Sequence, residues 1–349
     1  MSIIPFVKRI IRKSTIKQTP TKDSLPVVTC KMDKQPEQAT SLHDTKLQPY
    51  YTFSNGAWKE NGRPLPTTDL LSNDIKIKLL TWNIDFQAAA GPQRMVAVLQ
   101  YLKSILISSS LSADMLTVIF FQEMTASDLD IIQSTSWIQS RFHITDISPI
   151  NWHSRYGTTT LVDLRLPLKS VFRAQYASRM GRDALFIDLD CGDGNSRIRL
   201  GNTHLESLAA DPPKRPAQVA LASGLLHDDS VHGGVLAGDF NAIQNFDRTL
   251  HAENGLKDTY LEEGGIEGAE KEGGGEECEK GWTWGMQSYG VQRKRFGCSR
   301  MDKMLFCGGV RLGKLERIGE GVKVPEGEVG EGMFVTDHLG LMADLAIER

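Results

Sequence analysis

Polar side chains that can bind a metal ion or a phosphate follow several apolar stretches of this 349-residue chain. Each stretch is typical of a buried strand, and the polar residues stand where such a strand would end or begin. They are Asn83 and Asp85, Gln122 and Glu123, Asn202, His204 and Glu206, Asp239 and Asn241, Asp302, and Asp337 with His338. A buried strand that ends in a carboxylate or an imidazole places that group at the rim of its sheet. These groups can converge only where the rims of two packed sheets meet.

Each of these residues has an ordinary structural explanation when it stands alone. Asn83 is a common kind of turn residue, as is Asp239 within Gly238-Asp239-Phe240-Asn241. Glu123 could be a solvated strand end and His204 a hydrogen-bonded structural histidine. Asp337 and His338 could be a surface pair. The set is a stronger signal than its members because all of them occur together, in one order along the chain.

Short elements of both types must position these residues. Period-two alternation and short apolar runs predict strands near 75–80, 115–121, 157–162, 184–189, 197–203, 234–238, 301–306 and 342–347. Apolar stripes predict helices over 92–105, 127–139 and 217–226, the first of them opened by Pro92. Regular alternation of strand and helix is absent from this pattern. The sequence therefore predicts an α+β fold or a four-layered α/β sandwich.

The composition excludes several classes of protein. Lys plus Arg is 40 and Asp plus Glu is 43, so the net charge of −3 rules out a globally basic binder but allows a local basic cleft. No apolar run approaches the roughly 20 residues that span a bilayer, so no membrane partner is expected. The five cysteines are widely spaced and form no Cys-x-x-Cys pair. Neither a zinc ribbon nor a disulfide framework is supported, and a reducing compartment is the simplest inference.

The chain divides into an N-terminal segment and one catalytic domain. Residues 1–73 are basic and then polar, and we expect them to be disordered. The first 22 residues fit a nuclear-import patch, a mitochondrial transit peptide or a plain tail equally well. Residues 74–349 form the domain, interrupted by flexible Gly- and Glu-rich inserts at 262–281 and 319–332. The inserts are expected to be loops with almost nothing to bury.

Several short motifs occur in a defined order along the chain. They are Trp82-Asn83, Gln122-Glu123, Thr203-His204-Leu205, Gly238-Asp239-Phe240-Asn241, Arg300-Met301-Asp302-Lys303 and Asp337-His338. This series resembles the endonuclease/exonuclease/phosphatase superfamily. Three stretches are most similar to its tyrosyl-DNA phosphodiesterase 2 family: Thr81-Trp82-Asn83-Ile84-Asp85, Thr203-His204-Leu205-Glu206-Ser207 and Trp282-Thr283-Trp284. The resemblance covers residues 74–349. It implies two mixed β-sheets packed face to face and flanked by helices, as in deoxyribonuclease I.

The resemblance also implies a metal-dependent phosphodiesterase. Glu123, with Asn83 alongside, would hold one Mg²⁺, for which Mn²⁺ is an expected substitute. Asp239 would orient and deprotonate the attacking water, and Asn241 would fix a phosphate oxygen. These residue types suit the chemistry, because hydrolysis of a phosphodiester needs charge neutralisation and a positioned nucleophile.

Two histidines complete the implied site. His338 would donate to the phosphoryl oxygens and stabilise the transition state. Asp302 would hold the other nitrogen of that imidazole, which fixes its tautomer and favours its charged form. His204 would be a further phosphate contact.

The implied substrate is DNA with a 5′-tyrosyl end left by a topoisomerase, single-stranded near that end. A tyrosine phenol has a pKa of about 10, so it leaves with little help from a general acid. The product would be a 5′-phosphate end, the process DNA repair and the compartment the nucleus, with the cytoplasm as a second location and the mitochondrion as the alternative. A monomer is expected.

Basic and aromatic residues near the motifs could seat the strand. The candidates are Lys214, Arg215, Arg293, Lys294, Arg295 and Arg300, with Trp284 or Trp282 as a stacking face for a base. The alternative is that both tryptophans are core residues and that the charges lie on a solvated loop.

Five residues depart from the family pattern. They are Phe86, where many members have glycine, Ile243, where the nearest relatives often have arginine, Gly285 after the Trp-Thr-Trp motif, and Thr336 and Leu339 on either side of Asp337-His338. These changes put substrate affinity and strand preference in question more than catalysis. Two rivals remain open. One is a different enzyme of the superfamily, such as an abasic endonuclease, an RNA phosphodiesterase or a phosphoinositide phosphatase, and the other is an inactive scaffold of the same fold.

Overall fold

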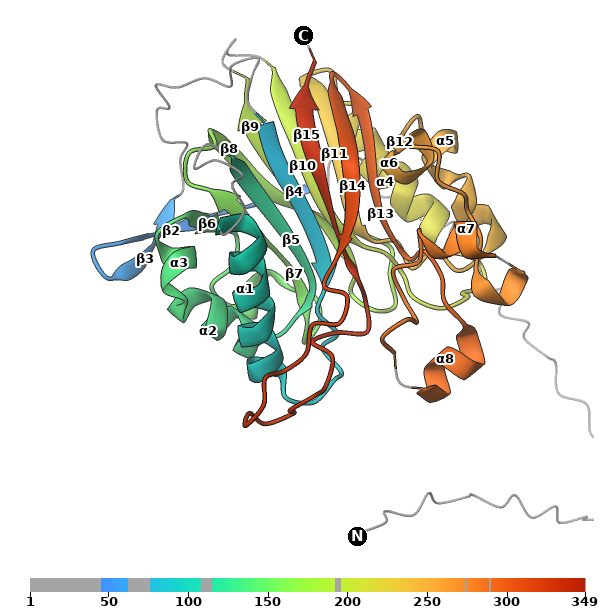
Figure 1. The fold of residues 1–349 in the computed structure, drawn as a ribbon. Coiled ribbons are helices and arrows are strands. Elements are labelled where there is room, and N and C mark those ends of the chain that lie inside the picture. Colours follow the sequence, from blue (N-terminus) through green and yellow to red (C-terminus); the bar gives the residue numbers. More distant parts are fainter. Residues whose placement is uncertain are drawn as a thin grey trace, which may run out of the picture. The chain divides into compact units, whose positions relative to one another are not determined.

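Two mixed β-sheets pack face to face in the computed structural model, with helices on their outer faces (Figure 1). The structure describes residues 45–61, 76–107, 115–191, 196–273, 275–288 and 290–348. All of them belong to one compact unit, Thr40–Arg349. This is the architecture that the sequence predicted. No described helix has the length and apolar character needed to cross a membrane.

One sheet has seven strands in the order β1-β8-β9-β10-β11-β13-β12. Their bounds are Thr45–Gln48 (β1), Leu168–Gln175 (β8), Asp183–Asp190 (β9), Arg197–His204 (β10), Val231–Asp239 (β11), Asp302–Gly308 (β13) and Lys257–Asp258 (β12). Only β10 and β11 pair in parallel in this sheet. Because these two strands run the same way, His204 and Asp239 stand opposite each other at their carboxyl ends.

The other sheet has eight strands in the order β14-β15-β4-β5-β7-β6-β2-β3. Their bounds are Val310–Ile318 (β14), Gly340–Ile347 (β15), Lys76–Asn83 (β4), Leu116–Met124 (β5), Gly157–Asp163 (β7), Phe142–Ile144 (β6), Tyr50–Ser54 (β2) and Ala57–Asn61 (β3). Here β4 and β5 form the parallel pair, so Asn83 and Gln122 are register partners at its carboxyl end. The two parallel pairs therefore end in the residues that the sequence marked as chemically capable.

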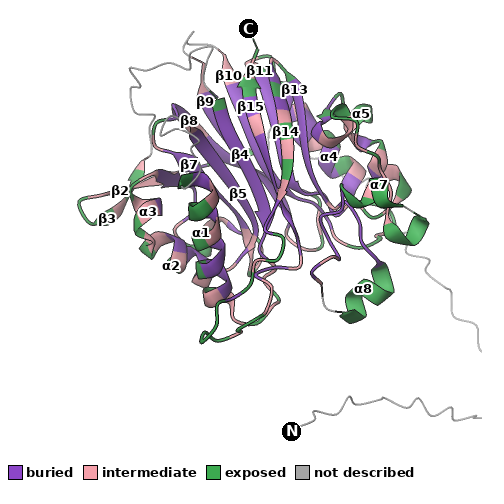
Figure 2. Cartoon of the chain, viewed as in Figure 1, coloured by how far each residue is buried: buried purple, intermediate pink, exposed green. Residues whose placement is uncertain are grey.

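Side chains along the central strands alternate between two cores. On β4, Ile77 and Leu79 pack between the sheets, whereas Leu80 and Trp82 pack under helices. The helices on that side are α1 (Gly91–Ile107), α2 (Ala126–Ser134) and α3 (Ser136–Gln139). Helix α4 (Arg215–Leu226) covers the seven-stranded sheet through a third core. Both faces of each central strand are thus buried (Figure 2), which makes the strand ends rigid supports.

The expected boundary at residue 74 is wrong. Strand β1 pairs with β8, and the hairpin of β2 and β3 extends the other sheet through β6. Asn55 and Gly56 have φ values of 52° and 78° between β2 and β3, the left-handed turn that Asn-Gly favours in a two-residue hairpin. The Asn55-Gly56 pair is a local signal for this hairpin, within a stretch whose overall polar composition suggests disorder. Residues 1–44 and 62–73 of the expected disordered segment lie outside the described ranges.

The two Gly- and Glu-rich inserts pack against the domain where the structure describes them. Helix α6 (Thr259–Glu262) leads into the first insert. Within 262–281 the chain forms a 3₁₀ turn at Glu270–Glu272 and α7 (Glu276–Glu279), and α8 (Gly290–Phe296) comes after it. Glu267 accepts a hydrogen bond from Nζ of Lys303 over 2.6 Å. In 319–332, Val324 is buried and bonds through its amide to the carbonyl of Met333 over 2.9 Å. Most described residues of the two inserts are exposed or half-buried, as expected of loops, but Glu267 and Val324 anchor the inserts to the domain.

Candidate active site

The carboxylate of Asp239 lies at the centre of the candidate site. It stands at the end of β11 and is buried. Asn83, at the end of β4 in the other sheet, donates from Nδ2 to Oδ2 of Asp239 over 2.9 Å. Asn241 donates its backbone N–H to Oδ1 over 2.8 Å and its side-chain amide to Oδ2 over 3.3 Å. The carboxylate is thus held from both sheets and from its own loop.

The backbone around this carboxylate is strained at three non-glycine residues. Asp85, Glu123 and Asn241 have φ values of 55°, 59° and 47°. Asn tolerates this region well, whereas Glu rarely adopts it. Strain of this kind persists only where the surrounding structure holds it, and it clusters at functional sites.

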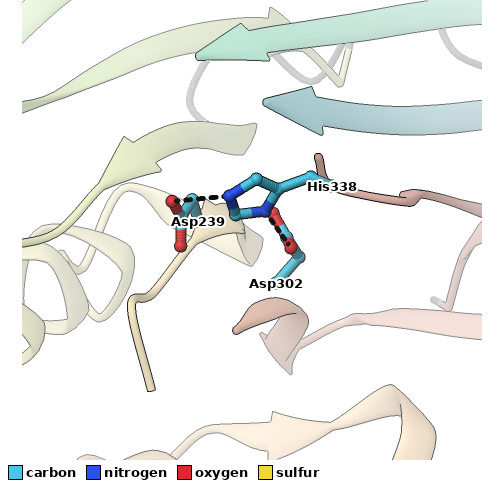
Figure 3. Close-up of side chains that lie close together, drawn as sticks. All are labelled: Asp239, Asp302 and His338. Atoms are coloured by element: carbon cyan, nitrogen blue, oxygen red, sulfur yellow. Dashed lines mark hydrogen bonds and ion pairs between the residues drawn. The ribbon is translucent and has the colours of Figure 1, made fainter. Parts of the chain in front are cut away.

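His338 faces Asp239 on one side and Asp302 on the other (Figure 3). Its Nδ1 lies 2.8 Å from Oδ2 of Asp302, and its Nε2 lies 3.9 Å from Oδ2 of Asp239. Burial alone lowers the pKa of His338, but the two carboxylates outweigh burial and raise the pKa well above its ordinary 6.5. His338 is therefore a cation at neutral pH, with its Nε2–H directed toward the centre of the site.

The second imidazole, His204, is neutral. Burial and then the charge of Arg182 lower its pKa to about 4. Arg182 donates from Nη1 to Nδ1 of His204. A guanidinium can only donate, so Nδ1 is the acceptor and the imidazole proton sits on Nε2. That atom lies 3.3 Å from Oδ2 of Asp239 and 3.8 Å from Oε1 of Glu123.

Arg182 was not predicted as a site residue. It is buried, and its other terminal nitrogen donates to Oγ of Ser207 over 2.8 Å. Its guanidinium lies over the ring of Tyr156, 5.1 Å from the centroid. No motif contains it, and only the contact with His204 reveals its position at the site.

Glu123 fits the role of a metal ligand. It follows the apolar body of β5, and its side chain is 14% exposed. Its Oε2 accepts the backbone N–H of Phe86 over 3.0 Å. Burial raises the pKa of Glu123 to about 7, although Arg182 and His338 oppose the shift. A desolvated carboxylate with no lysine or arginine nitrogen within 4.0 Å in the described residues favours a divalent cation, and the amide oxygen of Asn83 is a suitable neutral second donor.

A second group, Asp239, Asp302 and His338, also has ligand atoms within 4.8 Å of one another. The short bond from His338 to Asp302 engages Nδ1, and the raised pKa keeps the imidazole protonated. A protonated imidazole cannot ligate a metal. The donor chemistry therefore favours Glu123 and Asn83 as the cation site and leaves the trio as a proton-holding unit.

A cleft of about 630 Å³ opens over these residues. Its floor includes Glu123, Asp239, Asn241 and His338. Its walls come from the loops after β10 and β11, the acidic insert and α8. Ile243 lines the cleft with 38% of its surface exposed, so the position where relatives often have arginine presents an apolar side chain here.

Phe86, the second departure from the family pattern, stacks on Tyr156 beside the cleft. The ring centroids are 4.0 Å apart and the planes differ by 19°. Arg182 covers the Tyr156 ring at 5.1 Å, and Arg155 lies over Phe86 at the same distance. A glycine at position 86 would leave this stack incomplete.

The predicted nucleic-acid residues fall into two groups. Trp284 lines the cleft but is only 9% exposed, and it donates from Nε1 to Oδ2 of Asp337 over 2.8 Å. Arg293, Lys294 and Arg295 are exposed on α8, and Lys214 is half-buried just before α4. These five remain candidates for contacts with a strand.

Arg215, Arg300 and Trp282 are structural instead, so the prediction that Arg215 binds DNA is wrong. Arg215 is buried, and its Nε donates to Oδ1 of Asp247 over 2.8 Å as one arm of a bidentate pair. Arg300 is buried and pairs with Asp258 over 2.8 Å. Trp282 is buried and donates to a backbone carbonyl. The sequence shows that an arginine is charged, but it does not show which carboxylate, distant along the chain, pairs with it in the fold.

Arg94 is a further residue without a motif. It is buried in α1, and within the described part of the chain its guanidinium donates only to backbone carbonyl groups, five in all. One nitrogen, Nη1, reaches the carbonyls of Ile84 and Val335, each over 2.6 Å. Arg94 therefore ties the loop after Asn83 to the loop before His338.

Comparison with known proteins identifies the class. Residues 80–338 match the Endonuclease/Exonuclease/phosphatase family, and because this is most of the chain, the chain belongs to that family. Enzymes of this family hydrolyse phosphodiester or phosphate bonds and typically depend on a divalent metal. No curated protein sequence matches the chain significantly.

Solved structures of this fold include two forms of TDP2. TDP2 from Caenorhabditis elegans superposes with a TM-score of 0.57 at 21% identity, covering 78% of this chain and 75% of that one. TDP2 from D. rerio in complex with a single-strand DNA product has a TM-score of 0.55 at 15% identity, covering 78% and 99%. An endonuclease/exonuclease/phosphatase from Bacteroides vulgatus has a TM-score of 0.55 at 14% identity, also covering 78% and 99%. At these identities the likeness establishes the fold.

Proposed function

We propose that this protein is a divalent-metal-dependent phosphodiesterase that hydrolyses 5′-tyrosyl–DNA linkages and leaves a 5′-phosphate. The observation that carries the proposal is the joint placement of Glu123, Asp239 and His338 in one cleft, with Asn83 bonded to Asp239 and Asp302 bonded to His338. The likeness in fold to TDP2 structures, one of them with a single-strand DNA product, supports this choice within the family.

Glu123 and Asn83 would hold the metal ion, with Mg²⁺ the proposed ion and Mn²⁺ a substitute. The bound ion would neutralise charge on the phosphoryl group. Burial alone raises the pKa of Asp239, but His338 and His204 outweigh burial and hold the pKa below its usual range. Asp239 is therefore ionised at neutral pH and can accept a hydrogen bond from the attacking water, orienting it and receiving its proton.

The two imidazoles act on the phosphoryl oxygens in different ways. The charged His338 has its Nε2–H beside Asp239. From there it can donate to the phosphoryl oxygens, on which negative charge develops in the transition state. The neutral His204 offers its Nε2–H from the opposite strand end, between Asp239 and Glu123. Asn241 offers an amide donor from the same loop as Asp239. The phenolate leaves readily because the pKa of a tyrosine phenol is about 10.

The proposal includes a place of action. A 5′-tyrosyl end with a single-stranded stretch is the substrate, a monomer is the acting form and DNA repair in the nucleus is the process. The cytoplasm is a second location, and the basic N-terminus makes the mitochondrion the alternative.

Cleavage of a 5′-tyrosyl oligonucleotide with and without Mg²⁺ tests the proposal. The panel includes an abasic duplex, an RNA oligonucleotide and a phosphoinositide, because each stands for a rival enzyme of the family. We expect metal-dependent release of tyrosine and a 5′-phosphate product, and no release by Glu123→Gln. Faster turnover of another substrate would replace the proposed function. Inactivity on every substrate, with each metal, would indicate a scaffold.

A further inference from the structure

Glutamates of one short stretch in the acidic insert face basic residues around the cleft. We call residues 267–272 the acidic strap. Within it, Glu267 pairs with Arg300 and Lys303, Glu270 lies 3.6 Å from Arg293, and Glu272 pairs with Arg248. These basic residues come from different parts of the chain: the turn after β11, helix α8 and the start of β13. The glutamates of the strap therefore pair with basic side chains that lie around the candidate active site.

The strap is anchored through groups other than Glu272. The side chain of Glu267 is 18% exposed, and its partners Arg300 and Lys303 are buried. Trp282 donates to the carbonyl of Gly268 over 2.7 Å. The backbone of Glu270 bonds to the carbonyl of Cys298 over 2.9 Å. These contacts fix the course of the strap along the rim of the cleft.

The outer two pairs differ in kind from the buried one. The side chains of Arg248 and Glu272 are 39% and 42% exposed, and those of Arg293 and Glu270 are 45% and 40% exposed. Exposed pairs contribute little to stability and are screened by salt. The arginines can therefore exchange Oε1 of Glu270 and Oε2 of Glu272 for another anion without loss of the fold, while Oε2 of Glu270 keeps the backbone N–H of Cys298, 2.8 Å away.

The two arginines stand where a strand entering the cleft would pass. Arg248 lines the cleft itself. Arg293 lies on α8, which is exposed along its length (Figure 2), and its neighbours Gln292 and Phe296 line the cleft. Arg295 on the same helix is exposed as well. The arginines that pair with the strap therefore lie in or beside the cleft in which the phosphodiester would bind.

We propose that Glu270 and Glu272 occupy the Arg293 and Arg248 guanidinium groups in the free protein, and that the phosphate backbone of a single-stranded nucleic acid displaces them on binding. The inference rests on the proposed function and adds the surface that receives the strand. The strap then acts as a built-in competitor, which lowers affinity for weakly held polyanions.

Binding of a labelled single-stranded oligonucleotide without a tyrosyl group tests this inference at several salt concentrations. Glu270→Gln with Glu272→Gln keeps the shapes and leaves an oxygen to accept from the amide of Cys298. We expect about three- to tenfold tighter binding than wild type at low salt, converging at high salt as the pairs are screened. Glu276→Gln with Glu277→Gln is the matched control, since it removes the same charge from the same insert at exposed residues without an ion pair in the described chain.

Two further measurements distinguish displacement of the strap glutamates from other causes of tighter binding. Adding Arg248→Gln and Arg293→Gln to the strap variant should abolish the gain, because the released cations are then gone. An equal gain in strap variant and control, or no gain at all, overturns the inference. Cleavage of the 5′-tyrosyl substrate is measured in parallel. A gain in binding without cleavage rejects the proposed function alone, and cleavage without a gain rejects the strap alone.

Discussion

Asn83 and Asp239 join the two sheets at the site, through a hydrogen bond of 2.9 Å from Nδ2 to Oδ2. The donor ends β4 of the eight-stranded sheet and the acceptor ends β11 of the seven-stranded sheet. The distance between the proposed metal ligands, Glu123 and Asn83, and the proposed base, Asp239, is therefore set by how the two sheets pack. Mutations in the core between the sheets should therefore change the catalytic rate, because they shift the two partners of this hydrogen bond.

Glu123→Gln should abolish turnover and spare the fold. The amide keeps the shape of the side chain without its charge, and it removes a buried carboxylate whose pKa burial raises to about 7. The melting temperature without divalent metal should be equal or higher, and the rise that Mg²⁺ causes in wild type should vanish. Residual activity within about tenfold of wild type, which is only ~1.4 kcal/mol of barrier, contradicts the assignment.

Asp302→Asn should shift the alkaline side of the rate profile to lower pH. Burial lowers the pKa of His338, and Asp302 is the larger of the two carboxylate influences that raise it. Without that charge the imidazole loses its proton at a lower pH, and the reaction needs the charged form. At pH 8 we expect kcat to fall by about 100-fold or more. An unchanged alkaline limb, measured from kcat against pH, would show that His338 does not act as a cation.

Arg94→Lys should lower kcat by about tenfold or more with little change in KM. The lysine keeps the charge but cannot bridge the carbonyls of Ile84 and Val335, so the loops after Asn83 and before His338 shift. Guanidinium ion added to Arg94→Ala should restore part of the rate. Arg173→Lys is the control, since Arg173 is equally buried but pairs with Asp146 and Asp183. Stability loss without a change in kcat in both variants would limit Arg94 to a structural role.

Arg215→Met should destabilise the fold without altering the salt dependence of nucleic-acid binding. The substitution leaves the buried carboxylate of Asp247 without its partner, which costs about 3 kcal/mol or more. Urea unfolding measures the loss. Lys214→Gln is the comparison, because Lys214 precedes α4 and is partly exposed. If Arg215→Met flattens the salt slope as Lys214→Gln does, the arginine contacts the strand after all.

The free energy of unfolding should fall as the pH drops from about 6.5 to about 4 because of His143. Burial lowers the pKa of His143 to about 4, with Asp163 opposing the shift. Between these values the unfolded chain binds a proton at this residue that the folded chain does not, so acid favours unfolding. The contribution reaches up to about 3 kcal/mol at full shift. His143→Gln should flatten this part of the stability profile, and an unchanged profile would refute the assignment.

The elements nearest the site were predictable because their patterns are local. The strand ending at Asn83 begins with strict alternation, and the helix expected over 92–105 spans Gly91–Ile107 in the structure. Strands β8 and β14 were missed, since charged residues interrupt their apolar pattern. On β8 the buried Arg173 pairs with Asp146 and Asp183, which hydropathy cannot reveal.

Residues of the candidate site could be predicted only where they belong to a recognisable motif. Asn83, Glu123, His204, Asp239 and His338 all lie around one cleft, and the expected bond between His338 and Asp302 is present. Arg182 and Arg94 were missed because their roles depend on partners brought close by the fold. For the same reason, Arg215 was predicted to bind DNA, although its guanidinium is paired with the carboxylate of Asp247 inside the protein.

The N-terminal strands determine how far the chain can be shortened. β1 is the outermost strand beside β8, and the hairpin of β2 and β3 covers the edge of β6. A protein beginning at the first catalytic motif would keep every residue of the site yet expose the unpaired edges of both sheets. Bare edges recruit strands from other molecules, so such a protein should aggregate before its chemistry can be assayed. Inactivity of a fragment cut at residue 74 would then reflect self-association rather than a missing catalytic group.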